Sequence, residues 1–365
     1  MTLHGRQSVI EARLLNGTIL IYGATGYTGR LIAKAASDRG ARPILAGRNL
    51  DKVKRVAEPL GLSARAFDLG DPARIEAAIK DVAVVLCAAG PFSATSRPMA
   101  DACLRNRVHY LDVTGEIDVF EALAARDAKA EARGVMLLPG VGFDVVPSDC
   151  LAAHLKRRMP DANDLRRYLS LGADMSRGTA KTMIEAIAAG TRMRRKGRIV
   201  SRDRAEVGSC DFGAGDRPTV QVSWGDVATA FHSTGIPNIE VHFEASPALR
   251  AFAHTPWFVK SFLGLDPMQR LLKSQVNRLP EGPSEADRRA GQAVLVGQAR
   301  NNKGQTVRSR VRTPEGYSLT AATAFDAACR VVAGEIKPGF QTPSRAFGTD
   351  YILNFDGVVR EDLNR

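Results

Sequence analysis

Three glycines spaced three residues apart are the first residues of this chain whose types and positions suggest chemistry. Gly23, Gly26 and Gly29 follow the apolar run Ile19 to Tyr22 and precede a helical pattern that begins at Tyr27. Gly23 allows a tight turn, Gly26 lets the backbone approach a phosphate, and Gly29 lets the helix pack closely on the strand. A helix N-terminus after such a turn binds a diphosphate. The spacing therefore predicts a dinucleotide site, with an ordinary strand-to-helix turn as the alternative.

The ends of the next predicted strands indicate which dinucleotide is bound. Arg48 ends the second strand, at the position where an NAD site carries an acid for the ribose hydroxyl. A guanidinium suits a 2′-phosphate, which predicts NADP(H); alternatively, Arg48 only begins a solvated helix. Asp68 either accepts a hydrogen bond from the adenine amino group or is an exposed loop acid. The predicted cofactor-binding residues are Gly23, Thr25, Gly26, Tyr27, Thr28, Gly29, Arg48, Asp68, Ala88, Ala89, Gly90 and Pro91.

Reduction by hydride transfer also needs a proton delivered nearby, and acids after the later strands are the candidates. The predicted catalytic residues are Asp144 and Asp112, with Glu116 and His109 as weaker candidates. Asp144 would alternatively cap the helix that starts at Pro147, and Asp112 would accept hydrogen bonds from loop amides. The Tyr-x-x-x-Lys and Gly-x-Ser-x-Gly catalytic patterns are absent from the sequence. The histidines show no metal-ligand spacing, so we predict no metal site.

The elements that must position these residues alternate between strand and helix as far as Pro147. Short, almost wholly apolar strands that alternate with helices indicate a parallel sheet covered on both faces. The fold class predicted for this region is α/β, with a Rossmann-type doubly wound parallel sheet. The predicted strands are Ile19 to Tyr22, Pro43 to Arg48, Ala64 to Leu69, Asp81 to Ala89, Val108 to Val113 and Val135 to Pro139.

The pattern changes after about Leu151 and predicts a second, α+β domain with a mainly antiparallel sheet. Residues Ile239 to Ala245 alternate apolar and polar, as in a strand with one wet face, and residues 294–312 read as a hairpin. The glycine-rich stretch Gly208 to Arg217 is predicted to be a loop. We place an N-terminal extension at 1–17, the NADP-binding domain at 18–150 and the substrate domain at 151–316. We expect the segment 317–365 to return to the first domain.

Composition limits the classes of partner. The chain has 365 residues, 44% of them hydrophobic, and a net charge of +12. No apolar run approaches the roughly 18 residues of a membrane span, and five cysteines without a CxxC pair argue against a disulfide framework. We therefore expect a cytoplasmic protein. The basic cluster from Arg192 to Arg204 lacks interleaved aromatic residues, which argues against nucleic-acid binding. A homodimer, and peripheral membrane contact through Trp257, Phe258, Phe262 and Leu263, stay open.

Five motifs in this order resemble the saccharopine dehydrogenase-like oxidoreductases, which include the trans-acting enoyl reductases of lipid synthesis. The motifs are G-A-T-G-Y-T-G-R (23–30), A-G-R (46–48), G-P-F (90–92), H-Y-L-D-V-T-G-E (109–116) and G-F-D-V-V-P-S-D (142–149). The resemblance continues more thinly in S-T-G-I-P-N (233–238) and G-Y-S-L-T (316–320).

This resemblance implies a Rossmann domain with an inserted substrate domain. It further implies use of NADP(H) and hydride transfer to an enoyl or acyl substrate, or to an imine or amino-acid-like one. The alternatives are a non-catalytic NADP(H)-binding sensor and a lipid-associated protein at a membrane surface.

Overall fold

The computed structural model describes residues 19–171, 176–186, 190–246, 249–250, 253, 255, 259, 262–278 and 280–363. The contacts divide the chain into two compact units, and each is considered by itself. The first unit contains residues up to 114, 118–144 and 317–347. The second contains residues 115–117, 145–316 and 348–365.

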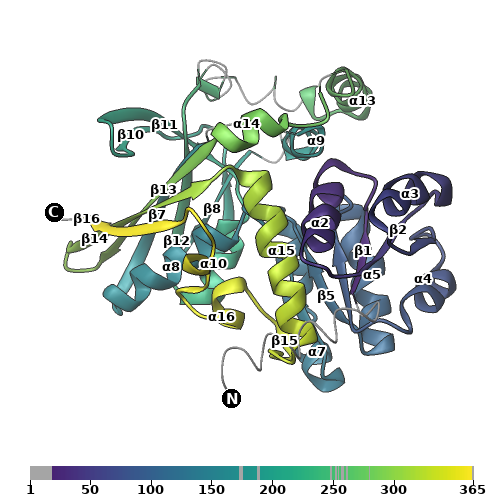
Figure 1. Ribbon diagram of the computed structural model, residues 1–365. Helices are drawn as coiled ribbons and strands as arrows, with labels where there is room; N and C mark the ends of the chain where they lie inside the picture. The colour runs from purple at the N-terminus through teal and green to yellow at the C-terminus, as the bar shows by residue number, and fades with distance from the viewer. Residues whose placement is uncertain are drawn as a thin grey trace. The chain divides into compact units, whose positions relative to one another are not determined.

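A parallel sheet forms the centre of the first unit (Figure 1). Its strand order is β15-β6-β5-β4-β1-β2-β3, which contains the 3-2-1-4-5-6 order of doubly wound dinucleotide-binding sheets. This confirms the predicted fold class, and β15 is an addition that the sequence did not indicate. The strands are β1 (Ile19–Tyr22), β2 (Ile44–Gly47), β3 (Ala64–Ala66), β4 (Val84–Cys87), β5 (His109–Asp112), β6 (Met136–Leu138) and β15 (Gly339–Phe340).

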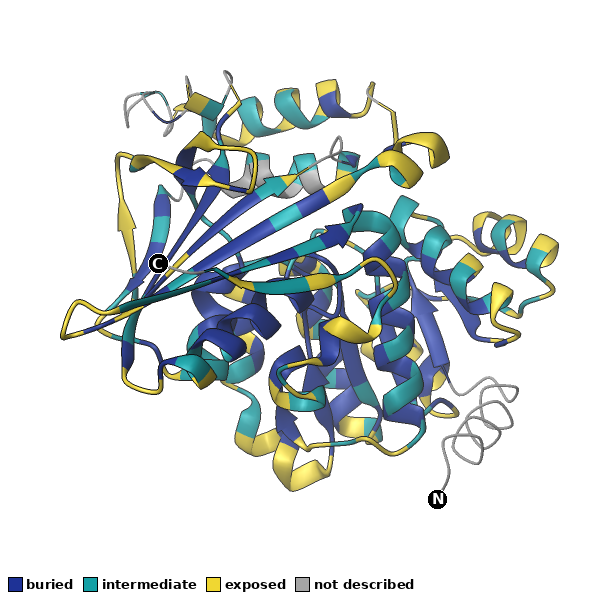
Figure 2. Cartoon of the chain, turned by 60° about the vertical axis from the view of Figure 1, so that its left-hand side comes forward, coloured by how far each residue is buried: buried dark blue, intermediate teal, exposed yellow. Residues whose placement is uncertain are grey.

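Helices cover this sheet and bury its strands. One core joins strands β1, β2, β4, β5 and β6 with three helices, α2 (Tyr27–Asp38), α3 (Leu50–Ala57) and α15 (Gly316–Val332). Ile21, Ile32, Leu138 and Phe325 meet in this core, so α2 and α15 cover the same face. In Figure 2 the strands are mainly dark blue and the helices carry exposed yellow faces. The remaining helices of this unit are α4 (Pro72–Ile79), α5 (Phe92–Asn106), α6 (Ile117–Ala124), α7 (Asp127–Arg133) and α16 (Pro343–Phe347).

The second unit is built on a mixed sheet whose described path runs β10-β11-β12-β7-β13-β14-β16. Only the β12–β7 pair is parallel among the described pairs, so the prediction of a mainly antiparallel sheet is confirmed. The predicted hairpin is also confirmed, with Arg300 opposite Thr306. The strands are β7 (Ala162–Leu171), β8 (Thr191–Arg195), β9 (Arg198–Arg202), β10 (Val207–Asp211), β11 (Asp216–Val222), β12 (Asn238–Glu244), β13 (Gln292–Asn301), β14 (Thr306–Pro314) and β16 (Val359–Leu363). The helices are α8 (Val146–Arg158), α9 (Arg177–Ala186), α10 (Asp226–Thr234), α13 (Asp266–Val276) and α14 (Glu285–Ala290).

Two sequence predictions for the second unit are wrong. The stretch Gly208 to Arg217 is the tip of the β10–β11 hairpin and not a loop, because Asp211 Oδ1 accepts hydrogen bonds from the amides of Gly213 and Gly215 and closes a tight turn. The polar face of β12, expected to be solvated, is buried at Glu240 and His242, which are 1% and 2% exposed, and only Glu244 is half-buried. Arg166 and Arg195 pair with the Glu240 carboxylate and supply the opposite charge at this buried position.

The C-terminal part of the chain is shared between the two units. Residues 317–347 lie in the first unit, whereas 348–365 lie in the second, where β16 pairs with β14. Trp257 and Phe258, expected to contact a membrane surface, lie outside the described residues, and Phe262 is exposed. No helix within the described part of the chain is both long and apolar enough to cross a membrane.

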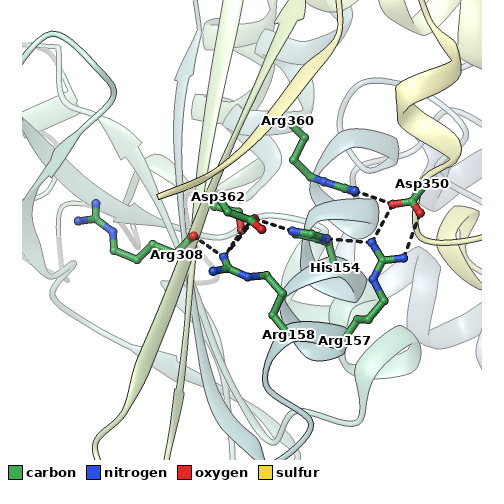
Figure 3. A network of polar contacts seen from close by, with 8 residues as sticks. His154, Arg157, Arg158, Arg308, Asp350, Arg360 and Asp362 are labelled. Carbon is green, nitrogen blue, oxygen red and sulfur yellow. Dashed lines mark hydrogen bonds and ion pairs between the residues drawn. The ribbon is translucent and has the colours of Figure 1, made fainter. Parts of the chain in front are cut away.

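Charged side chains fasten the last strand to α8 within the second unit (Figure 3). His154 Nε2 lies 2.7 Å from Asp362 Oδ1, and His154 Nδ1 lies 3.1 Å from Nη2 of Arg157. Arg157 also donates to both oxygens of Asp350, each at 3.0 Å. Because a guanidinium can only donate, Nδ1 is the acceptor and Nε2 carries the proton that Asp362 accepts. His154 is therefore neutral in this network.

Candidate functional site

The glycine turn after β1 is packed backbone against backbone. The amides of Gly23 and Ala24 donate to the Ala46 carbonyl at 2.9 and 3.1 Å, and Gly23 has a φ of +89°. A Cβ on Gly23 would lie 2.7 Å from the Ala89 nitrogen, and one on Gly29 would overlap the Gly23 carbonyl oxygen. These contacts explain why each position requires glycine.

The same turn leaves the N-terminus of α2 suited to an anion. Gly26 is the N-cap and makes no side-chain capping bond. The first backbone amides of a helix have no carbonyl one turn earlier to accept their hydrogen bonds. They therefore need acceptors from outside the helix, and a diphosphate provides such acceptors. Arg30 Nη1 donates to the Thr25 carbonyl at 2.7 Å and so holds the turn. Of the other residues predicted here, Thr25, Tyr27 and Thr28 are half-buried.

Arg48 and Asp68 both lie at the carboxyl edge of the sheet, beside Tyr22. Arg48 is exposed just after β2 and makes no hydrogen bond or ion pair with the described residues. Asp68 Oδ1 accepts from the Gly70 amide at 2.7 Å. Burial raises the pKa of Tyr22 to about 12, with Cys87 and Asp68 adding to the rise and Arg48 opposing it. A cation is thus available at the position predicted for the 2′-phosphate.

The segment that follows β4 is held by a residue that the sequence analysis missed. The Thr95 hydroxyl donates to the carbonyls of Ala89 and Pro91 at 2.6 and 3.3 Å, and the Ala88 amide donates to the Tyr22 carbonyl. Gly90 is exposed between them. The only sequence signal was a hydroxyl residue in the first turn after G-P-F, a pattern too common to single out.

Asp112 accepts hydrogen bonds from its own strand and from the loops after β5 and β6. It is fully buried, and its Oδ2 accepts from the Tyr110 hydroxyl at 2.7 Å. Its Oδ1 accepts from the amides of Thr114 and Gly140, both at 3.0 Å. Burial raises the pKa of Tyr110 well above its ordinary value, and the nearby charge of Asp112 raises it further. Asp112 therefore joins the loops after β5 and β6, as in the alternative of an acid that accepts from loop amides, and its catalytic role stays a prediction.

Asp144 follows a loop that α15 holds in place. The Thr320 hydroxyl accepts from the Phe143 amide at 2.9 Å, and the Thr323 hydroxyl donates to the Val141 carbonyl at 2.8 Å. Asp144 itself is half-buried. The N-cap residue of α8 is Val145, which directly follows Asp144 and makes no side-chain capping bond.

The two weaker candidates differ in what the structure gives them. His109 Nδ1 accepts from the Met136 amide at 3.0 Å, and burial lowers its pKa. A neutral ring that bridges β5 and β6 is a structural feature of the sheet. Glu116 is half-buried and belongs to the short segment 115–117 of the second unit.

The end of the G-F-D-V-V-P-S-D motif lies in a buried ionic cluster of the second unit. Ser148 Oγ donates to Asp226 Oδ1 at 2.5 Å, and Ser233 Oγ donates to Asp149. Arg167 pairs with Asp226 and donates to the Ser148 carbonyl. Sequence reasoning missed Arg167 and Asp226, because only the folded sheet brings them to the motif. No group of three or more potential metal ligands occurs among the residues that the structure describes.

Comparison with known proteins agrees with this geometry. Residues 19–138 match the family Saccharopine dehydrogenase NADP binding domain. A trans-acting enoyl reductase of Mycobacterium leprae is 35% identical over 149 residues, which are 39% of this chain and 36% of the relative. A putative trans-acting enoyl reductase of Mycobacterium tuberculosis is 32% identical over 192 residues, covering 47% of this chain and 44% of the relative. The alignments thus span less than half of these curated relatives.

A solved structure extends the likeness to the whole fold. Apo saccharopine dehydrogenase (L-Glu forming) from Saccharomyces cerevisiae superposes with a TM-score of 0.61, covering 95% of this chain and 99% of that one at 13% identity. This similarity concerns the fold alone, whereas the family match supports a nicotinamide dinucleotide as cofactor. The resemblance indicated by the sequence motifs is confirmed, because residues 19–138 of this chain match the saccharopine dehydrogenase NADP-binding domain.

Proposed function

We propose that this chain is an NADP(H)-dependent oxidoreductase that transfers hydride to or from an enoyl or acyl substrate, or an imine or amino-acid-like one. The observation that carries the proposal is the glycine turn at the uncapped N-terminus of α2, at the carboxyl edge of a doubly wound sheet. The family match and the names of the relatives support it. When bound, the nicotinamide supplies the hydride chemistry, and the protein positions the reacting groups.

Each predicted residue has a role in this proposal. Backbone amides from Gly23 to Gly29 bind the diphosphate, and Arg48 pairs with the 2′-phosphate. Asp68 accepts from the adenine amino group, and the segment from Ala88 to Pro91 forms the wall along the ribose and diphosphate. Asp144 delivers or accepts the proton, and Asp112 holds the two loops beside it. The remaining members of the predicted set, Thr25, Tyr27 and Thr28, shape the turn and the first turn of α2.

The cofactor assignment predicts a measurable preference. NADPH should bind more tightly than NADH, and Arg48→Ala should remove most of that preference, because a charge-assisted pair with the 2′-phosphate is lost. Titration of NADPH and NADH by nucleotide fluorescence gives both dissociation constants. Arg55→Ala, on the exposed side of α3, is the matched control and should leave the preference unchanged. Equal affinity of the unaltered protein for both nucleotides would defeat the role of Arg48.

The proton-donor assignment predicts a loss of turnover without a loss of binding. Asp144→Asn should lower turnover by about 100-fold, since a positioned acid contributes roughly that much, and should leave NADPH affinity intact. The measurement is NADPH oxidation with an enoyl-CoA series and with oxo-acid and amine pairs. Asp51→Asn, an exposed acid of α3, serves as control.

Two results of this assay would count against the proposal. Unchanged turnover in Asp144→Asn would remove Asp144 as the acid. Tight NADPH binding with no turnover of any substrate class would favour a non-catalytic sensor.

A further inference from the structure

Two helices of the first unit begin with the same short pattern. Gly26, the N-cap of α2, is followed by Tyr27 and Thr28, and α15 starts Gly316-Tyr317-Ser318, within the motif G-Y-S-L-T that the proposed function leaves unexplained. Both helices cover one face of the parallel sheet and share one core. Almost 290 residues separate the two patterns along the chain. Their side chains nevertheless meet.

The meeting point is a pair of tyrosines. The rings of Tyr27 and Tyr317 lie 5.1 Å apart between centroids, at an interplanar angle of 87°. This edge-to-face arrangement is the favourable geometry for aromatic pairs. Tyr27 is the first residue of α2, directly after the Gly26 cap. The ring of Tyr317 therefore fixes the residue whose backbone forms the proposed diphosphate site.

One turn further along α15, a hydroxyl holds the opposite half of the site. Thr320 accepts from the Phe143 amide, and a Cβ on Gly142 would lie 2.9 Å from the Thr320 methyl group. Thr320 thus fixes the two residues that precede Asp144. The first turns of one helix contact both the glycine turn after β1 and the loop after β6.

We propose that the start of α15 is the positioning element of the cofactor site, with Tyr317 setting the diphosphate turn and Thr320 setting the loop that carries Asp144. The inference rests on the proposed NADP(H) function and deepens it. Neither residue needs to touch the reacting atoms. Each acts through a neighbouring residue. The test therefore measures the affinity for NADPH in variants chosen to separate binding from folding, and asks whether a conservative substitution restores that affinity.

The first experiment addresses Tyr317. Tyr317→Ala should raise the dissociation constant of NADPH about fivefold, the equivalent of one edge-to-face pair, while Tyr317→Phe keeps the ring and should bind as the unaltered protein does. Tyr317→Leu repeats the test with greater apolar bulk if the alanine variant folds poorly. Phe355→Ala is the matched control, because it removes a similar pair with Tyr351, at 5.3 Å and 85°, in the second unit.

The second experiment addresses Thr320 with a fragment of the cofactor. Thr320→Val removes the hydroxyl and should weaken NADPH more than 2′-phospho-ADP-ribose, which lacks nicotinamide, because the β4 to β6 half of such sheets faces the nicotinamide. Thr320→Ser keeps the hydroxyl and should restore NADPH binding. Tyr317→Ala should instead weaken both probes, since both contain the diphosphate.

The outcomes separate the inference from the proposed function. If the unaltered protein binds neither probe, the NADP(H) function itself fails. If it binds NADPH and Tyr317→Ala binds equally well, or Phe355→Ala weakens binding as much, the positioning role of Tyr317 is overturned. Equal weakening of both probes by Thr320→Val, or no rescue by serine, would overturn the role of Thr320.

Discussion

At the scale of single residues, the second unit depends on one buried arginine that serves two acids. Arg167 is 1% exposed, and Asp149 and Asp226 are fully buried. Burial lowers the pKa of Arg167, and the two carboxylates oppose that shift. Ser148 of G-F-D-V-V-P-S-D donates to Asp226, and Ser233 of S-T-G-I-P-N donates to Asp149. These serines stabilise the fold around α8 and α10. The motif therefore marks a structural cluster as well as the candidate acid Asp144.

Removing the arginine should be costly because it takes away the guanidinium that pairs with the buried carboxylate of Asp226. We expect Arg167→Met to lower the free energy of unfolding by about 3–5 kcal/mol, the usual range when one partner of a buried pair is lost. Urea unfolding followed by circular dichroism measures the change. Lys34→Met breaks an exposed pair with Asp38 on α2 and should cost less than about 1 kcal/mol. If both variants lost a similar free energy of unfolding, the buried cluster would contribute no more to stability than an exposed ion pair does.

At the scale of elements, a feature could be predicted when residues close together in the sequence determine it, and not when distant residues do. The strand, glycine turn and helix from Ile19 to Asp38 are local, and periodicity with glycine spacing predicted them. The alternation of β12 was read correctly as a strand. Glu240 on its polar face is nevertheless buried, and it pairs there with Arg166 and Arg195, which come from other strands.

Elements that depend on distant partners were out of reach of the sequence. Asp112 gains the Gly140 amide from 28 residues away, and Thr320 meets Phe143 across 177 residues. No local pattern records such pairings, so the sequence could not show that Asp112 joins two loops, and its catalytic role stays a prediction. The candidate cofactor residues were easier, because strand ends and glycine turns share one edge of the sheet. Their roles in binding remain predictions.

At the scale of the whole molecule, two buried groups make stability respond to pH in opposite directions. Burial lowers the pKa of His154 below its ordinary 6.5, with Arg157 and Arg360 acting alike and Asp362 opposing. Folding thus favours neutral His154, and its contribution is present above pH 6.5 and lost as the pH falls through the lowered value. Burial raises the pKa of Asp226 from 3.8 to about 6, although Arg167 and Ser148 oppose it. Folding favours its protonated form, so stability is gained as the pH falls through about 6.

The two contributions can be separated by removing one group at a time. Thermal unfolding midpoints of each protein are compared between pH 7.5 and 5.5. In His154→Gln the unfolding midpoint should fall less, or rise more, between pH 7.5 and 5.5 than in the unaltered protein. The reason is that His154, whose stabilising contribution is lost on acidification, is absent. Asp226→Asn should shift the pH dependence the other way, because the gain from protonation is gone. Asp38→Asn, an exposed acid, should keep the pH dependence of the unaltered protein. If both variants also kept it, neither His154 nor Asp226 would titrate differently in the folded and unfolded chain, and the electrostatic account of the second unit would fail.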